Sequence, residues 1–265
     1  GIHEKANSRG ISVTNTVTET FVDFRKKYFG FDTPWFQADI AKRFETSEPG
    51  SITVVLMPPE SGKTTLTEDH LTYEISRNPT ALITIVSEGE KMARKMSRRI
   101  QRRLEPDGSS QDMVLRYGPY RSPSGARSGQ PWSTDAWTVH KGMDEDSRDF
   151  TVAVGGWKSN IAGTRATRLH VDDMQSLKSL NSTEQMIDIF RQDMLSRPGE
   201  TGRTTINGTR VGENDIYERM NDLFGGEDFF RLIKYPAIVM NQMTGEPEPL
   251  WKERYSMESL DRMRK

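Results

Sequence analysis

Cysteine is absent from the sequence, and histidine occurs only four times. The missing thiols exclude disulfide bonds and thiolate metal sites, and with so few histidines we do not expect a zinc site either. No apolar run approaches the roughly 20 residues that a helix needs to cross a bilayer, and no signal-peptide pattern opens the chain. These absences are compatible with an intracellular protein that has no membrane partner.

A bulk excess of one charge is lacking too, since 37 basic and 38 acidic residues leave a net charge of −1. Any affinity for nucleic acid must therefore come from a local patch. Residues 91–103 carry seven lysines and arginines around an apolar residue at every fourth position. This pattern predicts an amphipathic, strongly basic helix. It fits contact with DNA phosphates, but a solvated helix face is the commoner explanation.

The order of hydrophobic patterns predicts the fold. Short β-branched runs alternate with helical segments, which favours an α/β fold with a mainly parallel, doubly wound sheet flanked by helices. The expected strands are 51–57, 81–86, 150–154, 168–171 and 203–206. Gly155-Gly156 is expected to break its strand, and Ser87 to Glu90 have the spacing of a capping box that opens a helix. We expect a flexible lead-in over 1–20, one domain over 21–240 and a linker over 241–265.

The motif Glu60-Ser-Gly-Lys-Thr-Thr65 lies between the first expected strand and a helical segment. In that context, backbone amides at the helix N-terminus can bind phosphate oxygens, Lys63 can reach the β- and γ-phosphates, and the Thr64 hydroxyl can ligate Mg²⁺. The motif predicts a P-loop NTPase with ATP and Mg²⁺ as cofactors. The residues expected at the nucleotide are Pro59, Glu60, Ser61, Gly62, Lys63, Thr64 and Thr65. The usual first glycine is replaced by Met57, so the entry turn must be built differently.

Hydrolysis needs carboxylates at the end of a neighbouring strand. Asp172 is the candidate for the magnesium shell and Asp173 for the catalytic carboxylate, and the alternative is a solvated acidic turn. Gln37 lies upstream of the motif, where many motor ATPases carry a glutamine that hydrogen-bonds adenine; an exposed helix glutamine is the alternative. His170 is expected to be a packing or surface residue.

Several ordered segments together resemble the large terminase subunit of tailed phages, the DNA-packaging motor. They are Ile85 to Ile100, Val154-Gly-Gly, Ala162 to Asp173 and Ile206 to Ile216, and with the phosphate loop they span roughly residues 35–225. The resemblance implies an ATPase motor that translocates double-stranded DNA into a procapsid in the host cytoplasm. The implied partners are DNA, the portal protein, the small terminase subunit and further copies of the chain in a ring.

The resemblance also implies roles for single residues. Thr209 and Arg210, with Asn207, correspond to the segment that senses the γ-phosphate and couples hydrolysis to movement. Arg165 is the preferred arginine finger acting on a neighbouring subunit. Its alternatives are a surface salt bridge for Arg165 itself, or Arg121 and Arg127 as the finger. Leu250 to Leu260 resemble the passage to a nuclease domain, so we do not expect nuclease activity from this chain.

Two other functions remain open from the sequence. A helicase-like nucleic-acid translocase would share Gln37, Lys63 and Asp172, but it needs a second motor domain to complete its ATP cleft. A nucleotide-binding module that does not hydrolyse ATP is favoured by the atypical phosphate loop and by the aspartate at the position where a glutamate is usual.

Overall fold

The computed structural model describes residues 19–124, 129–140, 149–159 and 165–263. Its centre is a seven-stranded sheet in the order β3-β4-β2-β5-β6-β1-β7, in which all pairs except β3–β4 are parallel. The strands of this sheet are β1 (Ile52–Leu56), β2 (Ile83–Ser87), β3 (Ala136–Trp137), β4 (Val152–Gly156), β5 (Arg168–Asp172), β6 (Arg203–Gly208) and β7 (Phe230–Lys234). The predicted fold class is therefore confirmed.

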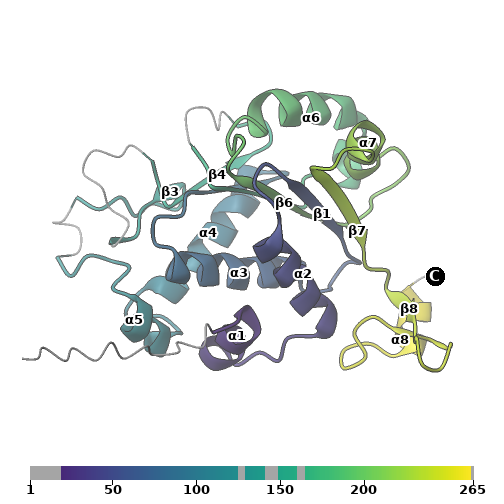
Figure 1. Ribbon diagram of the computed structural model, residues 1–265, viewed down its shortest axis with the longest axis horizontal. Coiled ribbons are helices and arrows are strands. Elements are labelled where there is room, and N and C mark those ends of the chain that lie inside the picture. Colours follow the sequence, from purple (N-terminus) through teal and green to yellow (C-terminus); the bar gives the residue numbers. More distant parts are fainter. Residues whose placement is uncertain (1–18, 125–128, 141–148, 160–164, 264–265) are drawn as a thin grey trace, which may run out of the picture.

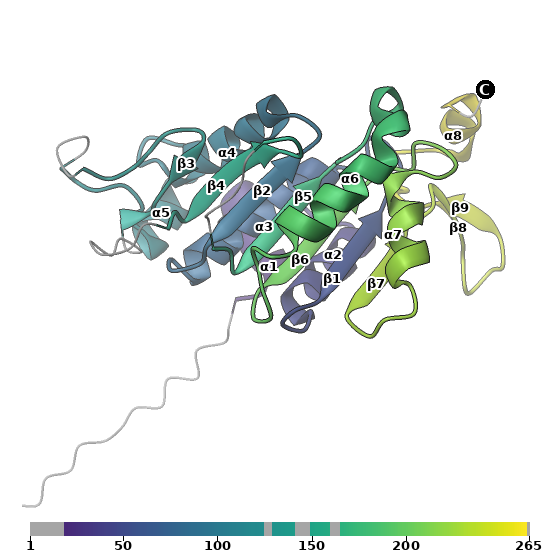
Figure 2. The same ribbon diagram turned by 90° about the horizontal axis from the view of Figure 1, so that it is seen from above.

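Helices cover both faces of the sheet (Figure 1). One face carries α1 (Phe21–Phe29), α2 (Trp35–Thr46), α3 (Lys63–Arg77) and α4 (Glu90–Leu104), with α5 (Gln111–Tyr117) below the β3 and β4 side. The opposite face carries α6 (Thr183–Ile189), its π-helical continuation Phe190–Met194, and α7 (Ile216–Phe224), which Figure 2 shows in front of the sheet. Beyond the β7 edge lie β8 (Ile238–Met240), β9 (Pro247–Pro249) and α8 (Met257–Met263).

The central strands are buried on both faces, which explains their continuous hydrophobic runs. Alternate side chains of β1 point to opposite layers: Val54 belongs to the core under α6 and α7, and Val55 to the core with α2 and α3. Leu169 of β5 is fully buried in the α6–α7 layer. Because side chains alternate along a strand, one short segment contributes to both hydrophobic layers.

Two local predictions are wrong. Ser87 does not cap α4. It is the last residue of β2, and its hydroxyl donates to the Asp172 carbonyl at 2.8 Å. The N-cap of α4 is Gly89, which makes no side-chain capping bond. Gly155 and Gly156 do not break their strand, because both belong to β4. A Cβ at Gly156 would lie 2.9 Å from the backbone nitrogen of Glu90, so the glycine permits the start of α4 to approach the sheet.

Several elements have no counterpart among the sequence predictions. Helix α5, strand β7, the β8–β9 hairpin and helix α8 all lie in segments whose composition is polar or mixed. Among the described residues, no helix is long and apolar enough to cross a bilayer.

Leu169→Ala should lower the free energy of unfolding by about 2–5 kcal/mol, because it leaves a cavity in the α6–α7 layer. The matched control is Leu115→Ala, whose side chain is 84% exposed and which should change stability by no more than about 0.5 kcal/mol. Urea denaturation followed by circular dichroism measures both values. Equal effects for the two variants would contradict the assignment of this core.

Candidate functional site

The phosphate-loop motif connects β1 to α3, as predicted. Gly62 (φ 77°) and Glu60 (φ 58°) both take left-handed backbone conformations, which shape the tight turn. Helix α3 begins at Lys63 and has no side-chain N-cap bond. The N–H groups of its first turn therefore have no acceptor within the helix and are available to an anion, with the helix dipole favouring negative charge.

Parallel pairing brings three strand ends to this loop. Strand β6 lies between β1 and β5, and Asn207 of β6 is the register partner of both Val55 and Asp172. Since the carboxyl ends of parallel strands share one edge of the sheet, the loop after β1 and the acidic pair after β5 face the same space. The structure thus unites motifs that are about a hundred residues apart in sequence.

Lys63 contacts Asp173 directly, with 3.0 Å between Nζ and Oδ2. The lysine side chain is 11% exposed and that of Asp173 is 41% exposed, so the pair lies at the mouth of the site. Asp173 also has a left-handed backbone (φ 44°), which is uncommon for a residue with a side chain. Its N–H donates to the Asn207 carbonyl at 2.9 Å, and this bond holds the turn.

Asp172 lies deeper, beside the hydroxyl of Thr64. Thr64 Oγ1 donates to Asp172 Oδ2 at 3.0 Å, whereas the buried Oδ1 has no hydrogen-bond partner among the described residues. Burial, followed by the repulsion of the Asp173 carboxylate, raises the pKa of Asp172 to about 7. A buried carboxylate with one free oxygen next to a threonine hydroxyl is suited to a hydrated divalent cation.

The predicted coupling segment lies partly at this edge. Asn207 is fully buried and its Nδ2 donates to Thr67 Oγ1 of α3 at 2.6 Å. Thr209 Oγ1 is buried without a hydrogen-bond partner in the described part of the chain. Arg210 instead pairs with Asp215 at 2.8 Å and Glu218 at 2.9 Å near the start of α7. Asn207 and Thr209 thus lie beside the phosphate loop or just after β6, while Arg210 is held by α7.

The structure places Arg165, the preferred arginine finger, away from the phosphate loop of its own chain. Arg165 is exposed and precedes β5 at the amino edge of the sheet, so the whole strand separates it from Asp172, about 13 Å from Arg168 onward. In this structure it cannot serve its own phosphate site. Arg121 stacks on the Trp132 ring, 5.3 Å from the centroid. Arg127 lies outside the described residues.

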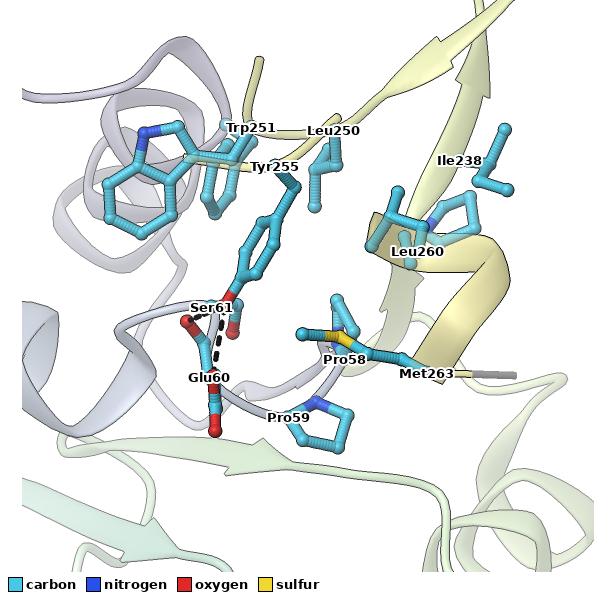
Figure 3. Close-up of a pocket in the computed structure, with 13 residues that line it drawn as sticks. Pro58, Pro59, Glu60, Ser61, Ile238, Leu250, Trp251, Tyr255, Leu260 and Met263 are labelled. Carbon is cyan, nitrogen blue, oxygen red and sulfur yellow. Dashed lines mark hydrogen bonds between the residues drawn. The ribbon is translucent and has the colours of Figure 1, made fainter. Parts of the chain in front are cut away.

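A pocket of about 680 Å³ adjoins the phosphate loop on the β7 side (Figure 3). Its polar wall is Glu60 and Ser61, and its other walls are mostly apolar and aromatic. The remaining lining residues are Phe36, Pro58, Pro59, Pro236, Ala237, Ile238, Leu250, Trp251, Tyr255, Leu260 and Met263. Tyr255 donates to the Glu60 carboxylate at 3.2 Å, so the C-terminal segment contacts the loop itself.

The sequence does not predict this contribution of the C-terminal segment. The linker role of 241–265 stays a prediction, but the structure shows that part of this segment packs against α2 and the phosphate loop. Leu250 is buried in the α2–α3 core, and the Trp251 ring lies 5.8 Å from that of Phe36. The two aromatic residues Trp251 and Tyr255 are the sequence signal that could have indicated this packing.

The structure is similar to the large terminase ATPase domain of Thermus phage P74-26, with a TM-score of 0.48 and 13% identity over 80% of this chain and 84% of that chain. An arginine-to-alanine mutant of the same domain has a TM-score of 0.49 and 12% identity with the same coverage. Drosophila ORC bound to DNA is similar at a TM-score of 0.26 and 10% identity, covering 89% of this chain and 37% of that one. No protein-family model matches the sequence, and no curated protein matches it.

The terminase neighbours are the class of protein that the sequence resembles. At these identities the likeness concerns the fold alone.

Asp172 should make stability depend on pH in the metal-free protein. Its folded pKa of about 7 lies above the value near 4 expected in the unfolded chain, so the unfolded state loses its proton first as pH rises. The carboxyl therefore destabilises the fold increasingly between about pH 4 and 7. Asp172→Asn should raise the free energy of unfolding by an amount that grows across this window and then levels off. Urea titrations at several pH values test this, and a pH-independent difference would count against it.

Proposed function

We propose that this chain is the ATP-hydrolysing motor domain of a viral DNA-packaging machine of the terminase kind. The observation that carries the ATPase part is the convergence of Lys63, Thr64, Asp172 and Asp173 at the carboxyl edge of β1 and β5. A lysine, a hydroxyl and two carboxylates beside an uncapped helix N-terminus are the set that phosphoryl transfer to water requires.

The residues present fit a magnesium nucleotide. The Thr64 hydroxyl would ligate the cation, and the unpartnered Oδ1 of Asp172 would accept from its water shell. When bound, Mg²⁺ neutralises charge on the β- and γ-phosphates. Ionisation of Asp172 becomes favourable in that state because a positive charge then faces the buried carboxylate.

Lys63 and Asp173 would separate when ATP binds. Phosphate oxygens compete for the Lys63 ammonium, which in the free protein pairs with Asp173. The released Asp173 carboxylate is partly exposed and can accept a hydrogen bond from the attacking water, orient it toward the γ-phosphorus and take its proton. Lys63 meanwhile stabilises the negative charge on the transferred phosphoryl group.

The aromatic pocket beside Glu60 and Ser61 is suited to the nucleobase. It adjoins the phosphate loop, its walls are mainly apolar, and Trp251 and Tyr255 are among its lining residues. Its volume, about 680 Å³, is within the range of small-ligand sites.

The packaging role rests on the resemblance of the ordered motifs in the sequence. It includes translocation of double-stranded DNA, a homo-oligomeric ring at a portal protein, a small terminase subunit as partner, and a location in the host cytoplasm during virus assembly. Arg165 lies at the amino edge of the sheet and cannot reach the phosphate site of its own chain, so as an arginine finger it would act on another subunit. Asn207 and Thr209, next to the acidic pair, are suited to sensing the γ-phosphate.

Two alternatives make different predictions. A helicase-like translocase would hydrolyse ATP only with a second motor domain in the cleft, and a binding module would bind ATP without turnover. Hydrolysis by this chain alone that rises more steeply than linearly with protein concentration favours the assembling motor. Binding without turnover at any concentration, even with DNA and portal protein, favours the module.

Lys63→Ala should abolish hydrolysis and weaken ATP binding, because it removes the cation that contacts the phosphates. Asp173→Asn should retain ATP binding but lower kcat by about 10²–10⁴-fold, the usual contribution of a general base. Lys42→Ala, on the exposed side of α2, is the matched control and should leave both unchanged. Phosphate release and calorimetric ATP binding measure the two effects. Normal turnover in Asp173→Asn would remove Asp173 from the mechanism.

A further inference from the structure

Gln37 lies beneath the phosphate loop and is closed to solvent. Gln37 is 1% exposed and Ser61 is 3% exposed. The Gln37 Nε2 donates to the Ser61 carbonyl at 2.8 Å, which ties helix α2 to the centre of the loop. An adenine contact needs an amide that faces the ligand, and Gln37 does not line the pocket beside the loop.

Arg25 fixes which way the Gln37 amide points. Its Nη1 donates to Gln37 Oε1 at 2.6 Å. Because a guanidinium has donors only, the amide oxygen must face Arg25, and the NH₂ group must then face the Ser61 carbonyl. Arg25 is therefore the donor to Gln37, and Gln37 is the donor to Ser61.

Arg25 is in turn held by a buried ion triad. Its Nε contacts Asp69 Oδ2 at 2.6 Å, and Arg103 Nη1 contacts Asp69 Oδ1 at 2.5 Å. Arg25 is 4% exposed and Asp69 is fully buried, so both are shielded from water. Asp69 belongs to α3, the helix that begins at Lys63. The chain of contacts thus starts at Asp69 in α3 and ends at Ser61 in the loop that precedes this helix.

The loop and Gln37 also meet at van der Waals distance. A Cβ at Gly62 would lie 2.9 Å from Gln37 Nε2, so only glycine allows the amide to sit this close to the loop. The left-handed backbone at Gly62 is the second reason for glycine at this position.

We infer that Arg25 and Gln37 are positioning residues that hold the phosphate loop in its binding conformation through the Ser61 carbonyl. The inference rests on the proposed phosphate site and assigns Gln37 a role that does not involve the base. Without the bond to Ser61, the loop populates other conformations, and apparent affinity falls by the fraction of molecules that remain competent. Because the loop binds phosphates, the loss should be the same for every triphosphate.

Gln37→Glu is the sharpest test, since it preserves shape and keeps an acceptor for Arg25. It removes the donor to Ser61 and places a carboxylate oxygen against the Ser61 carbonyl. The affinity for Mg-ATP, Mg-GTP and Mg-tripolyphosphate should fall by about tenfold, the equivalent of one lost buried hydrogen bond. In hydrolysis assays KM should rise more than kcat falls, because saturating ATP restores the competent loop.

Arg25→Met is the second variant and should weaken all three ligands in the same way. Arg168→Met is its matched control, because Arg168 is also a buried arginine paired with α3, 2.5 Å from Glu74, but lies at the other edge of the sheet. This control should lose stability in thermal melts without losing triphosphate affinity. If Arg25→Met does not fold, Gln37→Glu decides alone.

Isothermal titration calorimetry on the intact chain separates the outcomes. Equal weakening of ATP, GTP and tripolyphosphate in Gln37→Glu supports the inference. A loss confined to ATP would show that Gln37 contacts the base, and unchanged affinities would show that the loop does not need it; either result overturns the inference. Wild-type protein that binds none of the three ligands would instead overturn the proposed phosphate site.

Discussion

The parallel pairing of β1, β6 and β5 is the constraint on which the site depends. It places the loop after β1 and the aspartates after β5 at one edge of the sheet, with the end of β6 between them. The pairing is held by burial of the strands between two helical layers, and a one-residue slip would move each side chain to the opposite layer and turn Asp172 away from Thr64. The same strand register therefore determines both the packing of the core and the geometry of the site.

The parts of the site that the sequence predicts are those with a local cause. A buried strand, a glycine turn and a helix specify the β1–loop–α3 unit within about 25 residues, and the short strand before Asp172 specifies where the acidic pair falls. Parallel topology then puts Lys63 and Asp173 at the same edge of the sheet, where the two side chains contact each other. For this reason the sequence is sufficient to predict the fold class and to select Lys63, Thr64, Asp172 and Asp173 as candidates.

The features that escaped prediction depend on distant partners. Ser87 has the spacing of a cap, but the Asp172 carbonyl, which comes from another strand, takes its hydroxyl. The sequence leaves Gln37 as an adenine contact or an exposed helix residue, and it does not predict that α1 and α3 enclose this side chain with Arg25 and Asp69. The pocket beside the loop is lined by residues near positions 36, 60 and 255, which are far apart in the sequence. No hydrophobic periodicity predicts that these segments lie together.

The two aspartates show how one dipeptide supports two roles. Successive residues leave a strand end in different directions, and the left-handed turn at Asp173 enlarges that difference. Asp172 stays buried, and burial raises its pKa to about 7, while Asp173 is partly exposed and pairs with Lys63. Binding of a magnesium nucleotide would supply positive charge to the first and remove the lysine from the second. Ligand arrival itself would thus convert a resting pair into a cation-shell acceptor and a free base.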